Sequence, residues 1–354
     1  MIQRILFRIL MSPLALLYGL GVACRNFLYK IGILKEISFQ VPVISIGNLT
    51  VGGAGKSPHI EWLAGFLMQY LEVATLSRGY GRSTRGFLEV NGYNRVNDVG
   101  DEPLQFKRKY PSLGVFVSES RVLGIPQILN INYHTQVILL DDAFQHRAVK
   151  PYWNILLIEY SSLFTDDYLL PVGRLREWKS AYKRADTLII TKCPDDLIDS
   201  DRETALDKVK PKPGQEIFFT KYEYGRPYHL FFRAVTHAIN EKVHVLVVCA
   251  IANSSYMMQY VENQAASVKL IEYEDHHLFT RYEIAQLKKQ FDQIEAGRKI
   301  ILTTEKDAVR LERHLAYLEE QNMPIFVLPV HVSFYDAEDQ FRELVKVKLL
   351  DFKS

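Results

Sequence analysis

A glycine-rich loop followed by a lysine and a serine is the part of this sequence best suited to chemistry. The run Val43-Ile-Ser-Ile-Gly-Asn-Leu-Thr-Val-Gly-Gly-Ala-Gly-Lys-Ser-Pro58 places an apolar strand before the loop and an amphipathic helix after it. Glycines let successive backbone N–H groups point at phosphate oxygens, and the helix N-terminus adds a partial positive charge. The spacing therefore predicts a nucleotide triphosphate site, where Lys56 reaches the β- and γ-phosphates and the Ser57 hydroxyl holds Mg²⁺.

The match to the usual loop pattern, G-x-x-x-x-G-K-[ST], is incomplete because Thr50 stands where the first glycine is expected. An ordinary glycine-rich turn between a strand and a helix is the alternative interpretation. We favour the phosphate loop because Gly-Lys-Ser lies at the strand-to-helix junction, where a phosphate site requires it. The residues expected to bind the nucleotide are Thr50, Val51, Gly52, Gly53, Ala54, Gly55, Lys56 and Ser57.

Two adjacent carboxylates end a second apolar run, Val137-Ile-Leu-Leu-Asp-Asp142. In a protein with a phosphate loop, the end of such a strand is where an acidic residue meets the Mg²⁺ ion. Many strands also end in aspartate simply because the chain turns there. We therefore expect Asp141 or Asp142 to lie on the metal side of the nucleotide, and the sequence does not decide between them.

A third acidic residue, Asp101, lies in the run Gly100-Asp-Glu-Pro103 just before a predicted helix. Acidic residues are common near helix N-termini, where they act as caps, and this is one interpretation. The other is a general base that removes a proton from an attacking hydroxyl, as an aspartate does in kinases. The residues around Asp101 favour neither interpretation by themselves.

A pair of histidines lies in the run Asp275-His-His-Leu-Phe-Thr280, which follows a predicted strand. Thr280 and Glu283 form a capping box that starts a helix at about Arg281, so the histidines lie in a loop at the carboxyl end of a strand. His276 beside an aspartate is suited to be the oriented partner of a base or a metal ligand, and a solvated loop histidine is the alternative. Because no third ligand has the right spacing, structural zinc is discounted.

Arginines and polar side chains in several loops are candidates for binding a polar or anionic substrate. The run Ser77-Arg-Gly-Tyr-Gly-Arg82 sets arginines among glycines, which suits a bidentate grip on phosphate. The run Leu170-Pro-Val-Gly-Arg-Leu-Arg-Glu177 is also dense in charge. An ordinary surface turn is the alternative interpretation of such loops. The candidate substrate residues are Arg78, Arg121, Gln145, His146, Arg174 and Arg176.

Composition limits the classes of protein to be considered. The chain has 354 residues, of which 48% are hydrophobic, enough for two domains with cores of their own. The formal net charge is only +2, so no nucleic-acid partner is expected. The three cysteines, Cys24, Cys193 and Cys249, are far apart and show no metal or disulfide spacing, which suits a reducing cytoplasm.

Residues 1–35 differ from the rest of the chain, because the stretch from Ile9 to Cys24 is apolar and nearly free of charge. The stretch is shorter than the ~20 apolar residues needed to cross a bilayer, and it contains Pro13. We expect a helix that lies in or dips into the membrane face, with basic residues near anionic headgroups. A buried core helix and a secretory signal are the alternatives. The flanking basic residues are Arg4, Arg8, Arg25, Lys30 and Lys35.

From residue 41 onward, short apolar runs alternate with longer amphipathic ones, which predicts a parallel sheet with helices on both faces. A break near Lys210-Pro-Lys-Pro-Gly214 ends the first series. Two aromatic, strand-like runs at 216–222 and 228–235 then predict an antiparallel ribbon before a second alternating series. The predicted units are a membrane-associated segment at 1–35, a P-loop core domain at 36–215, a ribbon linker at 216–240 and a C-terminal α/β domain at 241–354.

Taken together and in this order, the motifs resemble the tetraacyldisaccharide 4′-kinase family of lipid A biosynthesis. The family's own loop has threonine at the position of Thr50. The chain departs from the family at Ala54 and Ser57, where threonine is usual, at Ala143, where glycine is usual, and at residues 249–254, which lack the expected glycine and proline. The matching segments are residues 47–58, 77–81, 100–103, 141–146, 175–177, 275–276 and 304–307.

The resemblance implies an ATP-dependent kinase that transfers the γ-phosphate to the 4′-hydroxyl of a lipid-linked glucosamine disaccharide, a tetraacyldisaccharide 1-phosphate. It implies a three-layer α/β/α P-loop core, a smaller α/β/α domain that closes over the site, and a two-stranded β-ribbon between them. It places Asp101 at the catalytic base, His276 at its partner and Lys56 on the phosphates, with Asp141 or Asp142 near Mg²⁺. It also implies an enzyme at the inner membrane, with its active site on the cytoplasmic side and no obligate protein partner.

Two other functions are compatible with the phosphate loop. A membrane-associated P-loop NTPase switch would hydrolyse the nucleotide and would have a base-reading Asn-Lys-x-Asp loop, whereas the chain offers Thr191-Lys-Cys-Pro194. A non-catalytic nucleotide-binding scaffold would keep the loop but would need neither Asp101 nor His276. Phosphate transfer to a lipid disaccharide distinguishes the kinase from both alternatives.

Overall fold

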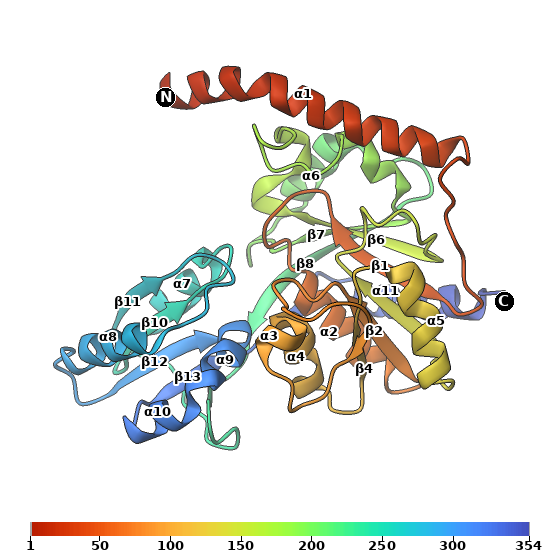
Figure 1. Cartoon of the computed structure of the whole chain (residues 1–354). Coiled ribbons are helices and arrows are strands. Elements are labelled where there is room, and N and C mark those ends of the chain that lie inside the picture. Colours follow the sequence, from red (N-terminus) through yellow and green to blue (C-terminus); the bar gives the residue numbers. More distant parts are fainter. Residues whose placement is uncertain (1, 354) are drawn as a thin grey trace.

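The computed structural model describes residues 2–353, which form a larger and a smaller α/β domain (Figure 1). A long helix, α1 (Ile2–Lys30), lies across one end of the larger domain. The smaller domain, drawn in teal and blue in Figure 1, lies beside the larger one. This arrangement confirms the predicted fold class of two α/β domains with an N-terminal apolar helix.

A nine-stranded sheet forms the centre of the larger domain. Its strands, in spatial order, are β14 (Val330–Phe334), β8 (Glu216–Tyr224), β7 (Thr187–Thr191), β6 (Trp153–Glu159), β1 (Val43–Asn48), β5 (Val137–Asp141), β2 (Val73–Ser77), β4 (Gly114–Val117) and β3 (Leu88–Glu89). Strands β3 and β14 pair antiparallel at the two edges, and the other pairs are parallel. The strand order reverses at β1, and open α/β sheets bind ligands outside the carboxyl ends of the strands at such a point.

Helices cover both faces of this sheet, because alternate strand residues enter different cores. Ile44 and Ile46 of β1 belong to the core that includes α2 and α11, whereas Val43 belongs to the core that includes α5. The segment Lys179–Arg184, whose sequence pattern is helical, forms a 3₁₀ turn instead of an α-helix, since it is short and buries only Ala181. The helices are α2 (Lys56–Leu67), α3 (Val96–Val99), α4 (Asp101–Lys109), α5 (Arg121–Ile131), α6 (Asp199–Val209) and α11 (Glu338–Leu350).

The smaller domain repeats this plan around a five-stranded sheet. Leu246 and Val248 of its central strand enter one core, and Val245 and Val247 enter the other. Its strands, in spatial order, are β11 (Ser267–Glu272), β10 (His244–Cys249), β12 (Lys299–Thr304), β13 (Ile325–Leu328) and the antiparallel β9 (Tyr228–His229). Its helices are α7 (Ser255–Glu262), α8 (Arg281–Asp292), α9 (Glu305–Leu311) and α10 (Leu315–Glu320).

The ribbon between the domains pairs different strands from those predicted. Residues 216–222 were expected to pair with residues 228–235, but β8 pairs with β14 in the antiparallel register Tyr224 to Val330 and Thr220 to Phe334. Strand β9 pairs instead with β13 in the smaller sheet. The physical reason is that β8 carries the chain out of the larger domain and β14 carries it back, so the two connections lie side by side.

The C-terminal residues return to the larger domain, which differs from the predicted unit at 241–354. Strand β14 belongs to the nine-stranded sheet, and α11 packs on the larger domain's core. Phe341 of α11 is 2% exposed. The centroid of its ring lies 4.6 Å from that of the Phe334 ring and 5.3 Å from that of the Trp62 ring. The apolar side chains of α11 must be removed from water, and they pack against α2 and β14.

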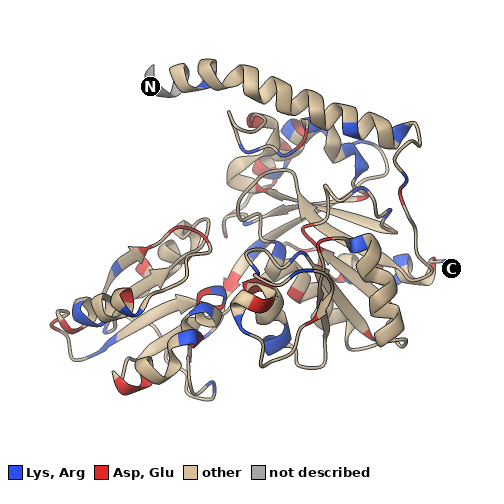
Figure 2. Ribbon diagram, viewed as in Figure 1, with Lys and Arg blue, Asp and Glu red and all other residues tan. Residues whose placement is uncertain are grey.

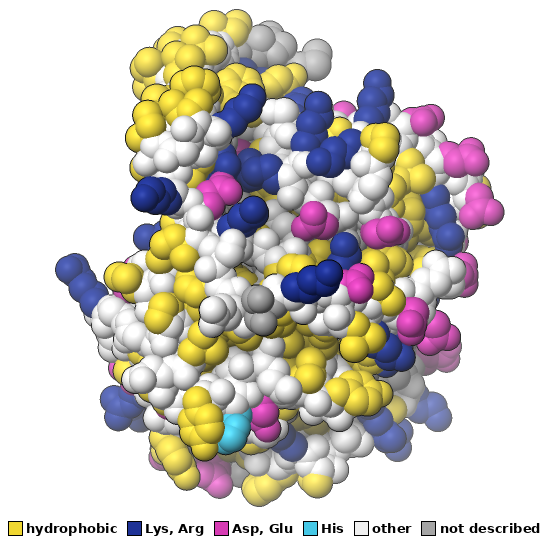
Figure 3. Space-filling view, turned by 90° about the vertical axis from the view of Figure 1, so that its right-hand side faces the viewer, with side chains coloured by type: hydrophobic (Ala, Val, Ile, Leu, Met, Phe, Trp, Pro, Cys, Tyr) yellow, Lys and Arg dark blue, Asp and Glu magenta, His cyan; other side chains and the backbone are white. Residues whose placement is uncertain are grey.

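Helix α1 is longer than the predicted apolar stretch and continues through Pro13. Proline cannot bond to the carbonyl four residues earlier, and here the Ser12 hydroxyl donates to that Ile9 carbonyl at 2.8 Å. In the described part of the chain, Leu6–Lys30 is long and apolar enough to cross a membrane, judged by length and composition. Charged residues are sparse along α1 (Figure 2), and its apolar side chains form the top of the molecule in Figure 3. Those exposed are Leu6, Phe7, Ile9, Leu10, Leu14, Leu16, Leu17, Leu20 and Phe27.

Replacing Phe341 with alanine tests the placement of α11. A buried phenylalanine truncated to alanine costs about 3–5 kcal/mol, so Phe341→Ala should loosen the larger domain. Leu350→Ala, at an 85% exposed position of the same helix, is the matched control and should change stability by less than about 0.5 kcal/mol. Hydrogen exchange of peptides from α2 and β14 measures the effect. Equal protection of these peptides in the two variants would contradict the packing of α11 on the larger domain.

Candidate active site

The phosphate loop joins the end of β1 to the first turn of α2, where Ser57 is half-buried. Gly55 caps α2 with a φ of 87°, and a Cβ on it would lie 2.9 Å from the Tyr222 hydroxyl, so glycine is required there. At the other end of the loop, the Val51 N–H donates to the Arg174 carbonyl at 2.8 Å. The loop is therefore fixed at both ends, with its backbone at the carboxyl edge of the sheet.

The Lys56 ammonium lies between two residues that end neighbouring strands. Its Nζ is 3.3 Å from Asn48 Oδ1 and 3.7 Å from Asp142 Oδ1. The Arg176 guanidinium donates to both Asp142 oxygens, at 2.9 and 2.8 Å, and to the Asn48 carbonyl at 2.8 Å. The Gln145 amide donates to the same carbonyl at 2.8 Å. These contacts hold Lys56 and Asp142 close to the phosphate loop.

The two aspartates at the end of β5 differ in environment. Asp141 is buried, and its Oδ1 has no hydrogen-bond partner among the described residues, while the Arg121 guanidinium donates to its backbone carbonyl at 3.1 Å. Burial and the neighbouring Asp142 raise the pKa of Asp141 to about 6. Burial acts against ionisation of Asp142 too, but Lys56 and Arg176 outweigh it and lower its pKa to about 2.

The remaining substrate candidates divide into two groups. His146 is partly buried, and its pKa is lowered to about 4 by burial and by the nearby Arg121 and Arg78 guanidiniums, so these three lie near one another. Arg174 is not part of this group, because its Nε donates to Asp167 Oδ2 at 2.9 Å, away from the phosphate loop. The structure thus brings Arg121, Gln145 and Arg176 into contact with the ends of β1 and β5, and it turns the Arg174 side chain elsewhere.

Asp101 begins α4 and is only 1% exposed. It reaches this position because Gly100, with a φ of 92°, lets the backbone approach Gly79, whose Cα would be 3.1 Å from a Cβ on Gly100. His276, after β11 in the smaller domain, lies with Nδ1 3.0 Å from Asp101 Oδ2. Its φ of 66° is unusual for a residue other than glycine and indicates a constrained loop. The structure therefore joins the two residues across the domain boundary.

A lysine occupies the space among these acidic groups. Lys306 Nζ lies 2.8 Å from Glu102 Oε1, 3.8 Å from Asp101 Oδ2 and 3.3 Å from His276 Nε2. The geometry of Asp101, Glu102 and His276 could otherwise hold a cation. The ammonium already supplies that positive charge, so we assign no metal to this cluster. Burial raises the pKa of Glu102 to about 7 despite the lysine.

Comparison with known proteins gives the family. A model of the family described as tetraacyldisaccharide-1-P 4′-kinase matches residues 7–350. The tetraacyldisaccharide 4′-kinase of Phocaeicola vulgatus is 40% identical over 345 residues, covering 96% of this chain and 93% of that protein. The chain belongs to the tetraacyldisaccharide 4′-kinase family. A second family member, from Bacteroides thetaiotaomicron, is 38% identical over 343 residues, with 94% of this chain and 90% of that protein covered.

A solved structure of this family has the same fold. The crystal structure of LpxK from Aquifex aeolicus, determined in complex with ATP, is similar with a TM-score of 0.76 and 28% sequence identity. The match covers 97% of this chain and 99% of that one. The predicted family and fold are thereby confirmed.

Sequence reasoning gave no role to Asn48, Lys306 or Arg310, which the structure brings to the site. Arg310 of α9 is 1% exposed, and its Nε donates to Asp101 Oδ2 at 3.0 Å. The segment 304–307 belongs to the family resemblance, but it ends three residues before Arg310. The only further signal is the spacing of Asp307 and Arg310, and such i,i+3 pairs are ordinary on exposed helix surfaces.

Helix α1 docks directly on the segment that carries Arg176. The Tyr18 hydroxyl donates to the Arg176 carbonyl at 2.8 Å, and the Trp178 indole donates to the Gly19 carbonyl at 2.8 Å. The Arg25 guanidinium lies 2.6 Å from the fully buried Glu177 carboxylate. The apolar helix is therefore tied to the segment that holds Asn48 and Asp142.

The basic residues around α1 differ from the expectation that all of them face lipid headgroups. Arg25 is directed at Glu177, and the Arg8 guanidinium lies over the Tyr168 ring, 5.2 Å from its centroid. The side chain of Arg4 lies outside the described part of the structure. A buried carboxylate such as Glu177 must be paired, and this requirement turns Arg25 toward the protein.

Two glycines of α1 provide a matched test of this docking. A Cβ on Gly19 would lie 2.6 Å from Trp178, whereas a Cβ on Gly21 would meet nothing within 4 Å. Gly19→Ala should therefore displace α1, and tryptic cleavage at Arg25 should become faster. Gly21→Ala should leave the cleavage rate unchanged or lower it, because alanine favours helix by about 1 kcal/mol. Equal cleavage of the two variants would contradict the docking.

Proposed function

We propose that this protein is an ATP-dependent kinase that transfers the γ-phosphate to the 4′-hydroxyl of a tetraacyldisaccharide 1-phosphate in lipid A biosynthesis. Family membership over nearly the whole chain supports the reaction. The observation that carries the chemistry is the Asp101–His276 contact, which the two domains build together beside the phosphate-loop cluster. Lys306 lies 3.8 Å from Asp101 Oδ2, and its positive charge also favours the ionised form of Asp141.

ATP binds, in this proposal, on the loop formed by residues 50–57. The backbone N–H groups of the loop and the N-terminus of α2 receive the phosphates, and Lys56 neutralises charge on the β- and γ-phosphates. The Aquifex aeolicus LpxK structure with ATP supports the choice of nucleotide. The contact of Lys56 with Asn48 and Asp142 holds the ammonium beside the loop before the nucleotide arrives.

The residues present fit a Mg²⁺ ion on the metal side of the nucleotide. Asp141 offers a buried carboxylate oxygen with no partner among the described residues, and Ser57 offers a hydroxyl in the first turn of α2. Both oxygens of Asp142 already accept from Arg176, so we propose Asp141 and Ser57 as ligands and Asp142 as the residue that orients Lys56. Mg²⁺ supplies positive charge against the phosphate oxygens.

Asp101 is placed to act as the base. Its carboxylate accepts the proton of the 4′-hydroxyl as the O–P bond to the γ-phosphorus forms and the bond to the β,γ-bridging oxygen breaks, leaving ADP. His276 lies with Nδ1 3.0 Å from Asp101 Oδ2 and with Nε2 3.3 Å from the Lys306 ammonium. The imidazole thus orients the carboxylate and shares its proton.

The lipid part of the acceptor would bind beside α1. A cavity of about 580 Å³ lies between Leu16 of α1 and Leu169, Leu175 and Trp178 of the larger domain, and its lining is mainly apolar. Its position next to the segment of Arg176 suits acyl chains whose sugar reaches the site. We infer that α1 enters the inner membrane from the cytoplasmic side, with the active site at the membrane surface.

Transfer of labelled γ-phosphate to a lipid disaccharide 1-phosphate in detergent tests the function. Wild-type protein should label the lipid, and Lys56→Ala should lower the rate by about 10²-fold or more, because the charge on the phosphates is lost. Lys150→Ala, at an exposed position, is the matched control and should transfer phosphate normally. ATP hydrolysis without lipid labelling would favour the NTPase switch. Binding of ATP with no turnover would favour the scaffold.

The two histidines of one loop allow a sharp test of the dyad. Asp101→Asn and His276→Ala should each lower the transfer rate, by about 10²–10⁴-fold for loss of the base. His277→Ala is the control, because His277 pairs with Glu283 of its own domain instead of Asp101. Near-normal rates in Asp101→Asn and His276→Ala, or an equal loss in His277→Ala, would contradict the assignment.

A further inference from the structure

Arg310 is a buried guanidinium that connects two carboxylates belonging to different domains. Its Nη1 donates to Asp307 Oδ1 and to the Ala250 carbonyl, each at 2.7 Å, within the smaller domain. Its Nε donates at 3.0 Å to Oδ2 of Asp101 in the larger domain, and its Nη2 donates to the same oxygen. One edge of the guanidinium is therefore anchored in its own domain, and the other reaches across to Asp101.

The anchor does not depend on Asp101. Asp307 is fully buried, and its Oδ2 accepts from the Ala250 N–H at 3.1 Å and from the Thr304 hydroxyl at 2.7 Å. The carboxylate that holds Arg310 is thus fixed by the backbone and cap of its own domain. A side chain whose rotamer is held in this way presents its free edge in one direction.

The two oxygens of Asp101 are used very differently. Oδ2 accepts from Arg310 and from His276 Nδ1, whereas Oδ1 accepts, among the described residues, only from the Glu102 N–H, at 3.1 Å. A carboxylate oxygen has two lone pairs, so Oδ2 is fully engaged and Oδ1 can accept one more hydrogen. The guanidinium therefore decides which oxygen is left for a hydroxyl group.

We propose that Arg310 is a positioning residue for the phosphoryl transfer, which holds Oδ2 of Asp101 so that Oδ1 receives the proton of the acceptor hydroxyl. Because α9 carries Arg310 and α4 carries Asp101, this holds only while the two domains are in contact. The inference rests on the proposed function and assigns a role to a residue that does not itself touch the substrate.

The charge of Arg310 has a consequence for pH dependence. Burial favours the neutral form of Asp101, but hydrogen bonds from Glu102 and His276 and the charges of Lys306 and Arg310 outweigh it and hold the pKa well below its usual range. Removing the guanidinium raises that pKa, so the base becomes protonated at a higher pH. The acid limb of kcat/KM should then move upward. The other charged groups that face this cluster are Asp275 and Asp307.

Phosphate transfer by Arg310→Met and Arg310→Lys, measured from about pH 4 to pH 9 with the lipid acceptor, tests the proposal. Arg310→Met should lower kcat by about 10–100-fold and bring into this range an acid limb that lies below it in the wild-type protein. The KM for ATP should stay within about threefold, because the phosphate loop is untouched. Arg310→Lys keeps the charge but not the planar fork, so its acid limb should move less and its kcat should remain below wild type.

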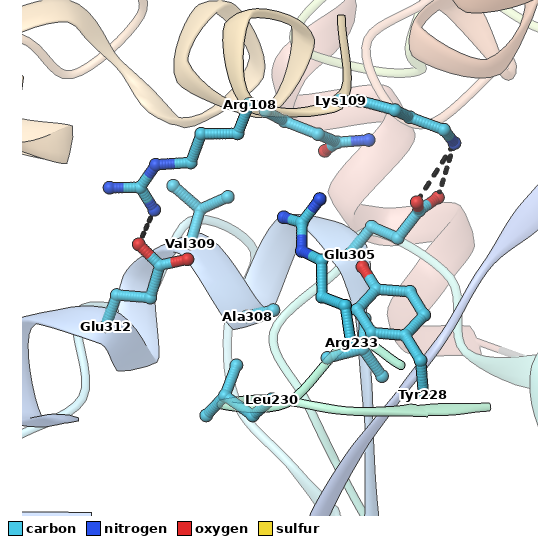
Figure 4. Close-up of a pocket in the computed structure, with 11 residues that line it drawn as sticks. Arg108, Lys109, Tyr228, Leu230, Arg233, Glu305, Ala308, Val309 and Glu312 are labelled. Carbon is cyan, nitrogen blue, oxygen red and sulfur yellow. Dashed lines mark hydrogen bonds and ion pairs between the residues drawn. The ribbon is translucent and has the colours of Figure 1, made fainter. Parts of the chain in front are cut away.

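An ion pair elsewhere between the domains provides the control. Arg108 of α4 pairs with Glu312, which follows α9, and Figure 4 shows this pair on the opposite side of a pocket from the Lys109–Glu305 pair. Arg108→Met removes a charge between the same elements and should leave the acid limb at the wild-type pH. Burial raises the pKa of Glu102 to about 7, so its titration would overlap the measured range. The pH profiles of all variants are therefore repeated in a Glu102→Gln background.

The outcomes separate the inference from the function on which it rests. Wild-type protein that transfers no phosphate would refute the proposed function. Normal transfer with an unmoved acid limb in Arg310→Met, or an equal shift in Arg108→Met, would refute only the role of Arg310. If the thermal midpoint shows that Arg310→Met is unfolded, Arg310→Lys decides, since a wild-type kcat in that variant would overturn the proposal.

Discussion

The buried carboxylate of Asp101, shared between two domains, is the interaction on which the rest of the structure depends. A carboxylate removed from water must be paired, and its partners His276 and Arg310 are both supplied by the smaller domain. The larger domain alone would leave this charge in water. Docking of the smaller domain and assembly of the proposed base are therefore one physical event, and the catalytic geometry exists only where the domains meet.

Other charges extend this connection to both ends of the site. Lys109 of α4 lies 2.9 Å from Glu305 of α9 and 2.7 Å from Glu61 of α2, the helix that starts at the phosphate loop. Charged residues gather accordingly where the domains meet in Figure 2. Buried ion pairs give orientation more than stability, because desolvation offsets their attraction. On the opposite side, α1 contacts the segment of Arg176, so helix α1, the phosphate loop and the domain boundary form one connected frame.

Much of this could be predicted, because the relevant signals are local in sequence. The phosphate loop and the paired aspartates of β5 can each be recognised as an apolar strand followed directly by polar or charged residues. The family resemblance predicted that Asp101 and His276 act together. The partner of β8 could not be found in this way, since strand pairing with β14 joins residues about a hundred positions apart. Arg310 was missed for a related reason. From its place near the end of α9, Arg310 is expected to be a surface residue, and it is buried only because the larger domain covers it.

The central claim is that the Asp101 carboxylate fixes the orientation of the two domains, and an interdomain distance tests it most directly. Spin labels at Ile131 of α5 and Tyr282 of α8, both exposed, would report the distance in a chain whose exposed Cys24 is replaced by serine. We expect one narrow distance distribution with Asp101 intact, and a longer, broader one in Asp101→Asn, which removes the charge and keeps the shape. The same narrow distribution in both proteins would contradict the account.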